Sequence, residues 1–213
     1  MYSACWWFVV LVGLAANSFA APRQHTVALG RWRVVNAVTD DGHPQQVKVR
    51  ALYVDRHFRE YAAGIPHDVT DRMFVIRRAR RVNDSLPTEN GKKPRWVWQL
   101  DGWLSIDRLT GRIAQLNFPA FDPEVSQASW YRDYAAYCGR SDDGDTIYMV
   151  VVQLGRRKPL LKKEFASDGC SAPLWERNPT RVTFKGRSEK NSFVVRAHSA
   201  IGETESESGE GPE

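Results

Sequence analysis

Basic side chains that could bind an anion are concentrated in two short segments of this sequence. They are Arg77, Arg78, Arg80, Arg81, Arg156, Arg157 and Lys158. Guanidinium and ammonium groups pair with phosphates and carboxylates, so these segments predict a docking surface for an anionic polymer, such as envelope phosphate or extracellular nucleic acid. The alternative is a solvated edge strand whose charges prevent pairing with another chain.

The spacing of the four arginines in the first segment constrains where they lie. On a β-strand, Arg78 and Arg80 face one side, and Arg77 and Arg81 face the other. Both faces cannot be packed core, so at least one pair must be solvent-facing, at a rim or ion-paired.

A histidine and two aspartates, His67, Asp68 and Asp71, are the candidates for acid-base chemistry. A carboxylate can orient an imidazole that acts as a general acid or base. The chain has no G-x-S-x-G, H-E-x-x-H or G-x-x-x-x-G-K-[ST] motif that would supply a matching nucleophile, metal or phosphate loop. Residues of these types also form turns and caps. A secreted hydrolase using this loop is therefore the second hypothesis, behind a non-catalytic protein.

Three aspartates surround Gly144 and offer the oxygen ligands that Ca²⁺ prefers: Asp142, Asp143 and Asp145. The spacing and distal glutamate of an EF-hand are absent. We interpret the segment as an acidic hairpin turn, and we predict no metal and no cofactor for the chain.

Aromatic residues provide a third possible chemistry, because exposed rings bind sugars or stacked bases. Trp96, Trp98 and Trp103 fall on neighbouring predicted strands. Large rings are more often buried, so we expect core packing. A carbohydrate-binding module with exposed tryptophans remains the third hypothesis.

The ends of the chain differ from its body. Residues 1–21 have an apolar stretch too short to cross a bilayer and small residues near Ala21, which predicts a cleaved signal peptide; a retained anchor is the alternative. The predicted location is secreted or periplasmic. Residues 202–213 hold five glutamates and almost no apolar side chain, so we predict a disordered acidic tail. The formal charge of +5 and these five glutamates leave the preceding chain at +10.

Removal of residues 1–21 leaves two of the three cysteines, Cys138 and Cys170. Two cysteines in an exported protein most simply form one disulfide. Neither lies in a local signature that would supply the partner histidine of a catalytic cysteine.

The elements that must position these residues are short strands with turn signals every 8 to 12 residues. We predict a single β-rich domain over residues 22–201, all-β, as a mostly antiparallel sandwich or barrel-like sheet of about a dozen strands. The Asp101-Gly102 dipeptide predicts a hairpin turn, residues 87–94 predict a mobile loop, and residues 122–134 are the one sizeable helix candidate.

Three segments carry a resemblance to known proteins. Residues 101–113 (DGWLSIDRLTGRI) and 141–150 (SDDGDTIYMV) resemble hairpins of β-propeller blades, although the chain has too few predicted strands for a closed propeller. Residues 128–139 (ASWYRDYAAYCG) resemble uncharacterised exported bacterial proteins with no assigned function. That resemblance implies export and no particular activity.

The leading functional hypothesis follows from these observations. We predict an exported, non-catalytic β-rich module that uses its basic face to bind an anionic polymer of the cell envelope or another envelope protein. No specific nucleic-acid motif is present.

Overall fold

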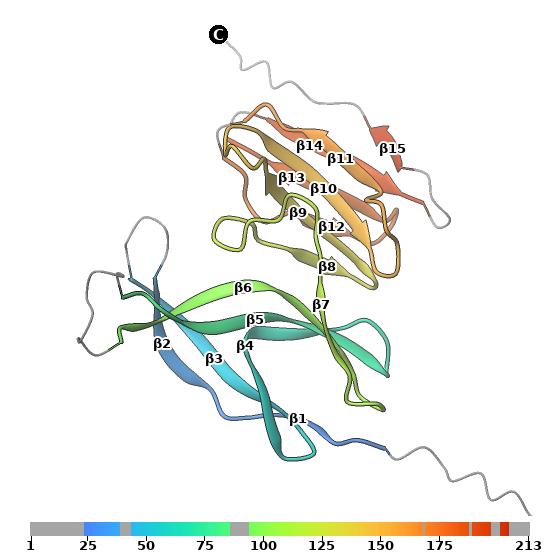
Figure 1. The fold of residues 1–213 in the computed structure, drawn as a ribbon. Coiled ribbons are helices and arrows are strands. Elements are labelled where there is room, and N and C mark those ends of the chain that lie inside the picture. The colour runs from blue at the N-terminus through green and yellow to red at the C-terminus, as the bar shows by residue number, and fades with distance from the viewer. Residues whose placement is uncertain are drawn as a thin grey trace, which may run out of the picture.

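The computed structural model describes residues 24–38, 44–85, 94–167, 169–187, 189–196 and 201–204. These residues form fifteen strands and no helix. Strands β1–β7 lie in the lower half of Figure 1, and strands β8–β15 lie in its upper half. The predicted all-β, mostly antiparallel fold is confirmed.

Seven strands form the first sheet. They are β1 (Val27–Leu29), β2 (Arg33–Val38), β3 (Pro44–Val54), β4 (His57–Asp68), β5 (Met73–Asn83), β6 (Trp96–Asp107) and β7 (Ile113–Leu116). The strand order is β1-β3-β2-β6-β5-β4, and β7 pairs with β6. Because β3 also pairs with β4, the five strands from β2 to β6 close into a ring, in which a single parallel bridge joins Ala37 to Trp98.

The four long strands β3–β6 each contribute to two separate hydrophobic clusters. One cluster centres on Val49, Ala63 and Ala79, and the other on Leu52, Ile76 and Ile106. Alternate residues of a strand point to opposite faces, so the two clusters lie on opposite faces of the curled sheet.

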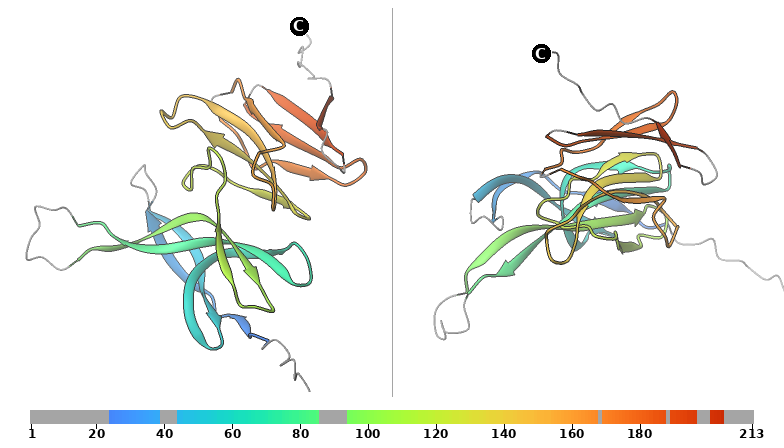
Figure 2. Two further views of the ribbon diagram at one scale, coloured as in Figure 1. Left: turned by 45° about the vertical axis from the view of Figure 1, so that its right-hand side comes forward. Right: turned by 90° about the horizontal axis from the view of Figure 1, so that it is seen from above.

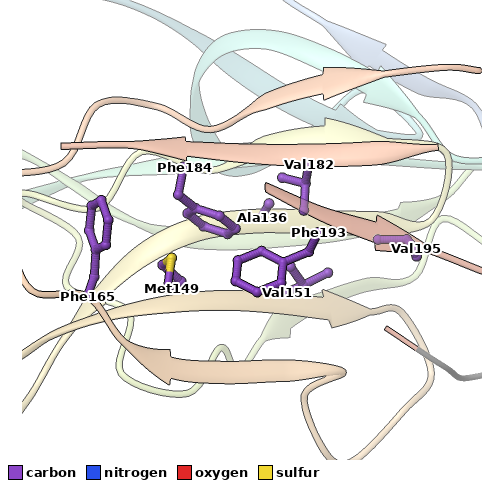
Figure 3. Close-up of a cluster of buried hydrophobic side chains, with 8 residues drawn as sticks. All are labelled: Ala136, Met149, Val151, Phe165, Val182, Phe184, Phe193 and Val195. Atoms are coloured by element: carbon purple, nitrogen blue, oxygen red, sulfur yellow. The ribbon is translucent and has the colours of Figure 1, made fainter. Parts of the chain in front are cut away.

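The remaining strands form two four-stranded sheets that face each other (Figure 2). One has the order β11-β10-β9-β8, and the other has the order β12-β13-β14-β15. Their bounds are β8 (Ser129–Tyr131), β9 (Tyr134–Arg140), β10 (Ile147–Gln153), β11 (Leu161–Glu164), β12 (Leu174–Glu176), β13 (Arg181–Lys185), β14 (Lys190–Val195) and β15 (Ile201–Thr204). Met149 and Val151 of one sheet meet Phe184 and Phe193 of the other in a buried hydrophobic core (Figure 3).

A disulfide between Cys138 of β9 and Cys170 before β12 joins the two facing sheets, with their Cα atoms 6.2 Å apart. This confirms the predicted bridge. The opposite face of the β9–β10 hairpin buries Tyr137, whose hydroxyl donates to the carbonyl oxygen of Pro119 at 2.7 Å. The segment that joins the first sheet to the sandwich therefore covers this face.

The predicted helix over residues 122–134 is wrong. Asp122 does cap a turn, because its Oδ1 accepts from the backbone N–H of Glu124 at 2.9 Å. The chain then turns away, because buried Ser126 donates its hydroxyl to the carbonyl oxygen of Cys138 at 2.7 Å. Trp130 and Tyr131 enter strand β8, as their aromatic rings favour. The cap signal was local, whereas the pairing with β9 is tertiary.

The predicted turn at Asp101-Gly102 is also wrong, because both residues lie inside β6. They sit at an irregularity opposite β5, between the pairs Arg77↔Trp103 and Ala79↔Leu100. The hairpin turn predicted at residues 142–145 does join two antiparallel strands, β9 and β10.

The predicted signal peptide, residues 1–21, and residues 87–93 of the predicted mobile loop lie outside the described residues. The acidic tail was predicted to begin at Gly202, but Gly202–Thr204 belong to β15, which pairs with β14. Those three residues are a correction to the tail; residues 205–213 lie outside the described part. The single-domain prediction remains a prediction.

Candidate functional site

The histidine and aspartates considered for acid-base chemistry are held by different partners. The Nε2 atom of His67 lies 2.7 Å from the carbonyl oxygen of Arg132, and its ring stacks on Trp130. Asp68 instead accepts from Arg108 Nη2 at 2.6 Å, and Arg108 also donates to the backbone oxygen of Asp71. Each contact fixes the fold, and none of the three predicted residues lines the clefts described below.

His67 is part of the junction between the first sheet and the sandwich. Trp130 of β8 contacts both His67 of β4 and Trp103 of β6, with ring centroids 5.7 and 5.2 Å apart. Beside them, Arg77 of β5 donates to the carbonyl oxygens of Asp101, Pro123 and Ser126. Burial lowers the pKa of Arg77, partly offset by the negative charges of Asp101 and Asp122. Arg77 thus stabilises the junction between the first sheet and the sandwich.

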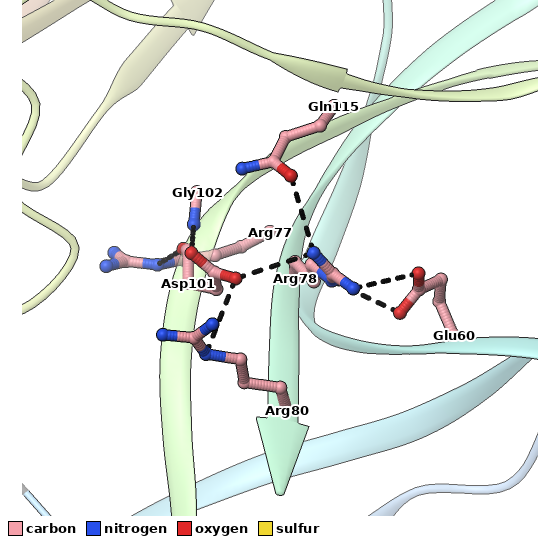
Figure 4. A network of polar contacts seen from close by, with 7 residues as sticks. All are labelled: Glu60, Arg77, Arg78, Arg80, Asp101, Gly102 and Gln115. Atoms are coloured by element: carbon pink, nitrogen blue, oxygen red, sulfur yellow. Dashed lines mark hydrogen bonds and ion pairs between the residues drawn. The ribbon is translucent and has the colours of Figure 1, made fainter. Parts of the chain in front are cut away.

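Arg78 and Arg80 share one side of β5, as predicted, and both meet carboxylates there (Figure 4). Arg78 makes a two-pronged contact with Glu60, at 3.1 Å from Nε and 3.0 Å from Nη2. Asp101, whose exposed fraction is only 9%, lies 3.6 Å from both arginines. The pair is therefore ion-paired, one of the outcomes that the spacing required.

The fourth arginine of β5 faces the opposite side, again as predicted. The guanidinium of Arg81 lies over the rings of Trp96 and Trp98, 5.7 and 5.9 Å from their centroids. Trp96 is 53% exposed, whereas Trp103 is 8% exposed. The expectation of core packing therefore holds for Trp103 and fails for Trp96.

The second basic segment lies in a different environment. Residues 156–158 form the turn after β10 and, with residues 115–119 and 152–155, line a cleft of about 160 Å³ at the junction of β7 and β10. The turn closes through a hydrogen bond of 3.1 Å from the N–H of Arg156 to the carbonyl oxygen of Gln153. Gly155 has a φ of 82°, a left-handed conformation that glycine adopts at little cost.

The cleft has the composition of an anion site. Arg156, Arg157 and Lys158 are exposed, and among the described residues no carboxylate pairs with them or lines the cleft. Polar amides come from Gln115 and Asn117 on the opposite wall. Three cations facing a concave wall with donors can neutralise phosphate or carboxylate groups of a bound chain.

Sequence reasoning missed the residues that decide which cations are free. Glu60 and Asp101 lie 18 or more residues from the arginines that they neutralise. Asn117 lies 39 residues before Arg156 in the chain. For Glu60 and Asp101 the only sequence signal was the alternation of polar and apolar residues in β4 and β6. Alternation shows which face of a strand a side chain is on, but it does not show which residue of the neighbouring strand lies opposite.

The described residues show no other obvious chemistry. No group of three or more His, Cys, Asp or Glu side chains among them is arranged to hold a metal ion. The acidic turn at residues 142–145 is a hairpin tip, where the hydroxyl of Ser141 donates a hydrogen bond to the carboxylate of Asp143 and thereby lowers the pKa of that carboxyl group. Within the same residues, no helix is long and apolar enough to span a membrane.

Comparisons of the chain with protein-family models, with curated proteins and with solved structures found no match. The candidate site therefore rests on its own geometry.

Proposed function

We propose that this protein is an exported, non-catalytic binding module for a phosphate-bearing polymer of the cell envelope, and that the polymer binds in the cleft beside residues 156–158. The observation that carries the proposal is the cleft itself. It combines three exposed cations, Arg156, Arg157 and Lys158, with no lining carboxylate among the described residues.

Arg77 and Arg78 of β5 contribute little to this binding. Arg77 and Arg78 already bind carbonyl and carboxylate oxygens of the same chain, so an incoming phosphate would have to displace these intramolecular partners. An internal partner is present at high effective concentration. The turn cations have no such competitor among the described residues.

Export is supported by the disulfide between Cys138 and Cys170, because such bonds persist in oxidising compartments. An envelope location would place the basic cleft beside polymers that carry repeated phosphates. Weak contacts to successive phosphates then add, and their strength falls as salt concentration rises.

The test is the binding of fluorescently labelled inorganic polyphosphate, followed by anisotropy over a series of salt concentrations. We expect the triple variant Arg156→Gln, Arg157→Gln, Lys158→Gln to bind on the order of tenfold or more weakly at low salt. Its logarithmic salt slope should fall by about 2, at roughly 0.7 for each lost phosphate contact.

The matched control removes three exposed cations that do not line the cleft: Arg177 in the turn after β12, Lys185 of β13 and Lys190 of β14. This control changes the net charge equally, so it should retain most of the affinity. Equal losses in both triple variants would mean that net charge attracts the polymer, and would overturn the proposed site.

A further inference from the structure

A second cleft, in the first sheet, combines arginines with aromatic rings. It has a volume of about 410 Å³, and its lining includes Arg31, Arg33, Tyr53, Phe58 and Tyr61. No residue lines both this cleft and the one beside residues 156–158. The two clefts are therefore separate candidate sites.

The strand register explains why these side chains converge. The N–H of Gly30 donates to the carbonyl oxygen of Ala51 at 2.8 Å, and Arg33 pairs with Val49, so the chain before β2 runs antiparallel to β3. Gly30 and Arg33 therefore lie on the face of Ala51 and Val49, and the chain has one extra residue between them, an irregularity that brings Arg31 to the lining of the same cleft. That face carries the aromatic side chains.

The rings form a connected row. The centroid of Phe58 lies 6.3 Å from that of Tyr53 and 4.7 Å from that of Tyr61. Tyr61 in turn lies 4.8 Å from Trp98, beneath the guanidinium of Arg81. Arg81 thus lies over one end of this row, and the other end lines the cleft together with Arg31 and Arg33.

Two features separate this row from ordinary core. Phe58 is 50% exposed, although burial of such a ring is favourable. Among the described residues, Arg31 and Arg33 have no carboxylate partner, and no carboxylate lines the cleft. An exposed ring beside unneutralised cations is suited to a ligand that is both planar and anionic.

We propose that this cleft binds single-stranded nucleic acid, with bases stacked on the Phe58 ring and its aromatic neighbours and with phosphates held by Arg31 and Arg33. Stacking of a base on an aromatic side chain is tolerant of sequence, and a cationic groove tracks the backbone. This inference is independent of the polymer proposed for residues 156–158.

Charge and hydrogen-bonding capacity favour nucleic acid over an acidic polysaccharide. Sugars present many hydroxyl groups, which amide and carboxylate side chains usually bind. The lining of this cleft contains neither: besides the arginines and aromatic rings it has only Gly30 and Ala51. Guanidinium groups and ring faces instead match phosphates and planar bases.

The test compares three labelled decamers: oligo-dT, an abasic deoxyribose-phosphate chain and an oligogalacturonate. We expect Phe58→Ala to weaken oligo-dT binding by at least about fivefold, the contribution of roughly one stacked base, and Phe58→Trp to restore it. Abasic binding should not change. The double variant Arg31→Gln, Arg33→Gln should weaken both nucleotide chains and lower the salt slope by about 1.4.

The control is Val34→Ala, which removes an equally exposed apolar side chain (59% exposed) that points away from Arg33 along β2. It should bind oligo-dT as the wild type does. The proposal is overturned if Phe58→Ala binds oligo-dT normally, or if the abasic chain or the oligogalacturonate binds as tightly as oligo-dT. The variant with residues 156–158 changed should keep its dependence on Phe58, which separates this proposal from the first.

Discussion

Two basic segments that look alike in the sequence have opposite fates in the fold. In β5, Arg77 donates to three carbonyl oxygens and Arg78 pairs with Glu60 and Asp101. In the turn after β10, residues 156–158 are exposed and have no carboxylate partner among the described residues. A run of cations therefore identifies a binding surface only when the neighbouring strands supply no counter-charge.

The difference follows from position in a sheet. Strand β5 has a neighbour on each side, β4 and β6, and each neighbour contributes a carboxylate at the level of Arg78. The turn after β10 shares its cleft with the end of β7, and among the described residues that line this cleft none is a carboxylate. We therefore expect the effect of a substitution on stability to decrease from the strand interior to the turn, as the burial of the charge decreases.

The largest expected effect is at Arg77. Arg77→Met retains the apolar stem but leaves the carbonyl oxygens of Asp101, Pro123 and Ser126 without their donor. We expect a loss of about 3 kcal/mol in the free energy of unfolding, measured by urea denaturation. Arg81→Met, which removes an exposed arginine over tryptophan rings, should cost less than about 1 kcal/mol. Equal losses would remove the distinction between tied and free arginines within β5.

The second effect is at Asp101, the carboxylate shared by Arg78 and Arg80. Asp101→Asn should lower the free energy of unfolding by about 2 kcal/mol, less than for a fully buried pair because both arginines are partly exposed. A double-mutant cycle with Arg78→Gln measures the coupling, which should be at least about 0.5 kcal/mol. Additive losses would show that the two residues act separately.

Sequence patterns predicted the local features well and the long-range ones poorly. Alternation along β5 correctly separated Arg78 and Arg80 from Arg77 and Arg81, since side-chain direction is set by the strand itself. The Asp-Gly pair at Asp101 was misread as a turn because the same dipeptide fits a strand irregularity, and only the pairing with β5 decides between them.

The candidate site shows the same division. The sequence predicts that the cations at residues 156–158 bind an anion. It does not predict the cleft beside them, because the other wall of the cleft is formed by residues 115–119, which are distant in the sequence. The helix predicted from the cap at Asp122 failed for the same reason, because the strand pairing that replaces it is tertiary. Tertiary pairing overrides a local preference worth about 1 kcal/mol.

An exposed ion pair provides an intermediate case, at Asp107. Arg72 donates to its carboxylate at 2.8 Å, and the N–H groups of Leu109 and Thr110 also donate to it. These contacts hold the pKa of Asp107 well below its usual value of 3.8. The resulting stabilisation is therefore complete above pH 3.8 and is lost as pH falls through the lower pKa of the folded state.

We expect the urea midpoint of the wild type to fall more steeply between pH 5 and pH 2.5 than that of Asp107→Asn, by a smaller margin than the changes at Arg77 or Asp101. Asp71→Asn, which removes an exposed carboxylate from a neighbouring loop, is the control and should follow the wild type. Parallel curves for all three proteins would show that the pair with Arg72 does not form in solution.

The smallest expected effect on stability is at the exposed cations of the turn after β10. Changing Arg156, Arg157 and Lys158 to glutamine removes no described ion pair, so the free energy of unfolding should stay within about 0.5 kcal/mol of the wild type. It should even rise slightly at low salt, because three like charges on adjacent residues repel each other and the repulsion is screened only over about 10 Å at 0.1 M salt. Thermal denaturation at two salt concentrations measures both effects.

A loss of 2 kcal/mol or more would mean that these cations contribute to the stability of the fold as much as those of β5, and the contrast between the two segments would disappear. A stable variant that no longer binds polyphosphate would instead show cations that contribute to binding and not to folding, as their lack of internal partners implies.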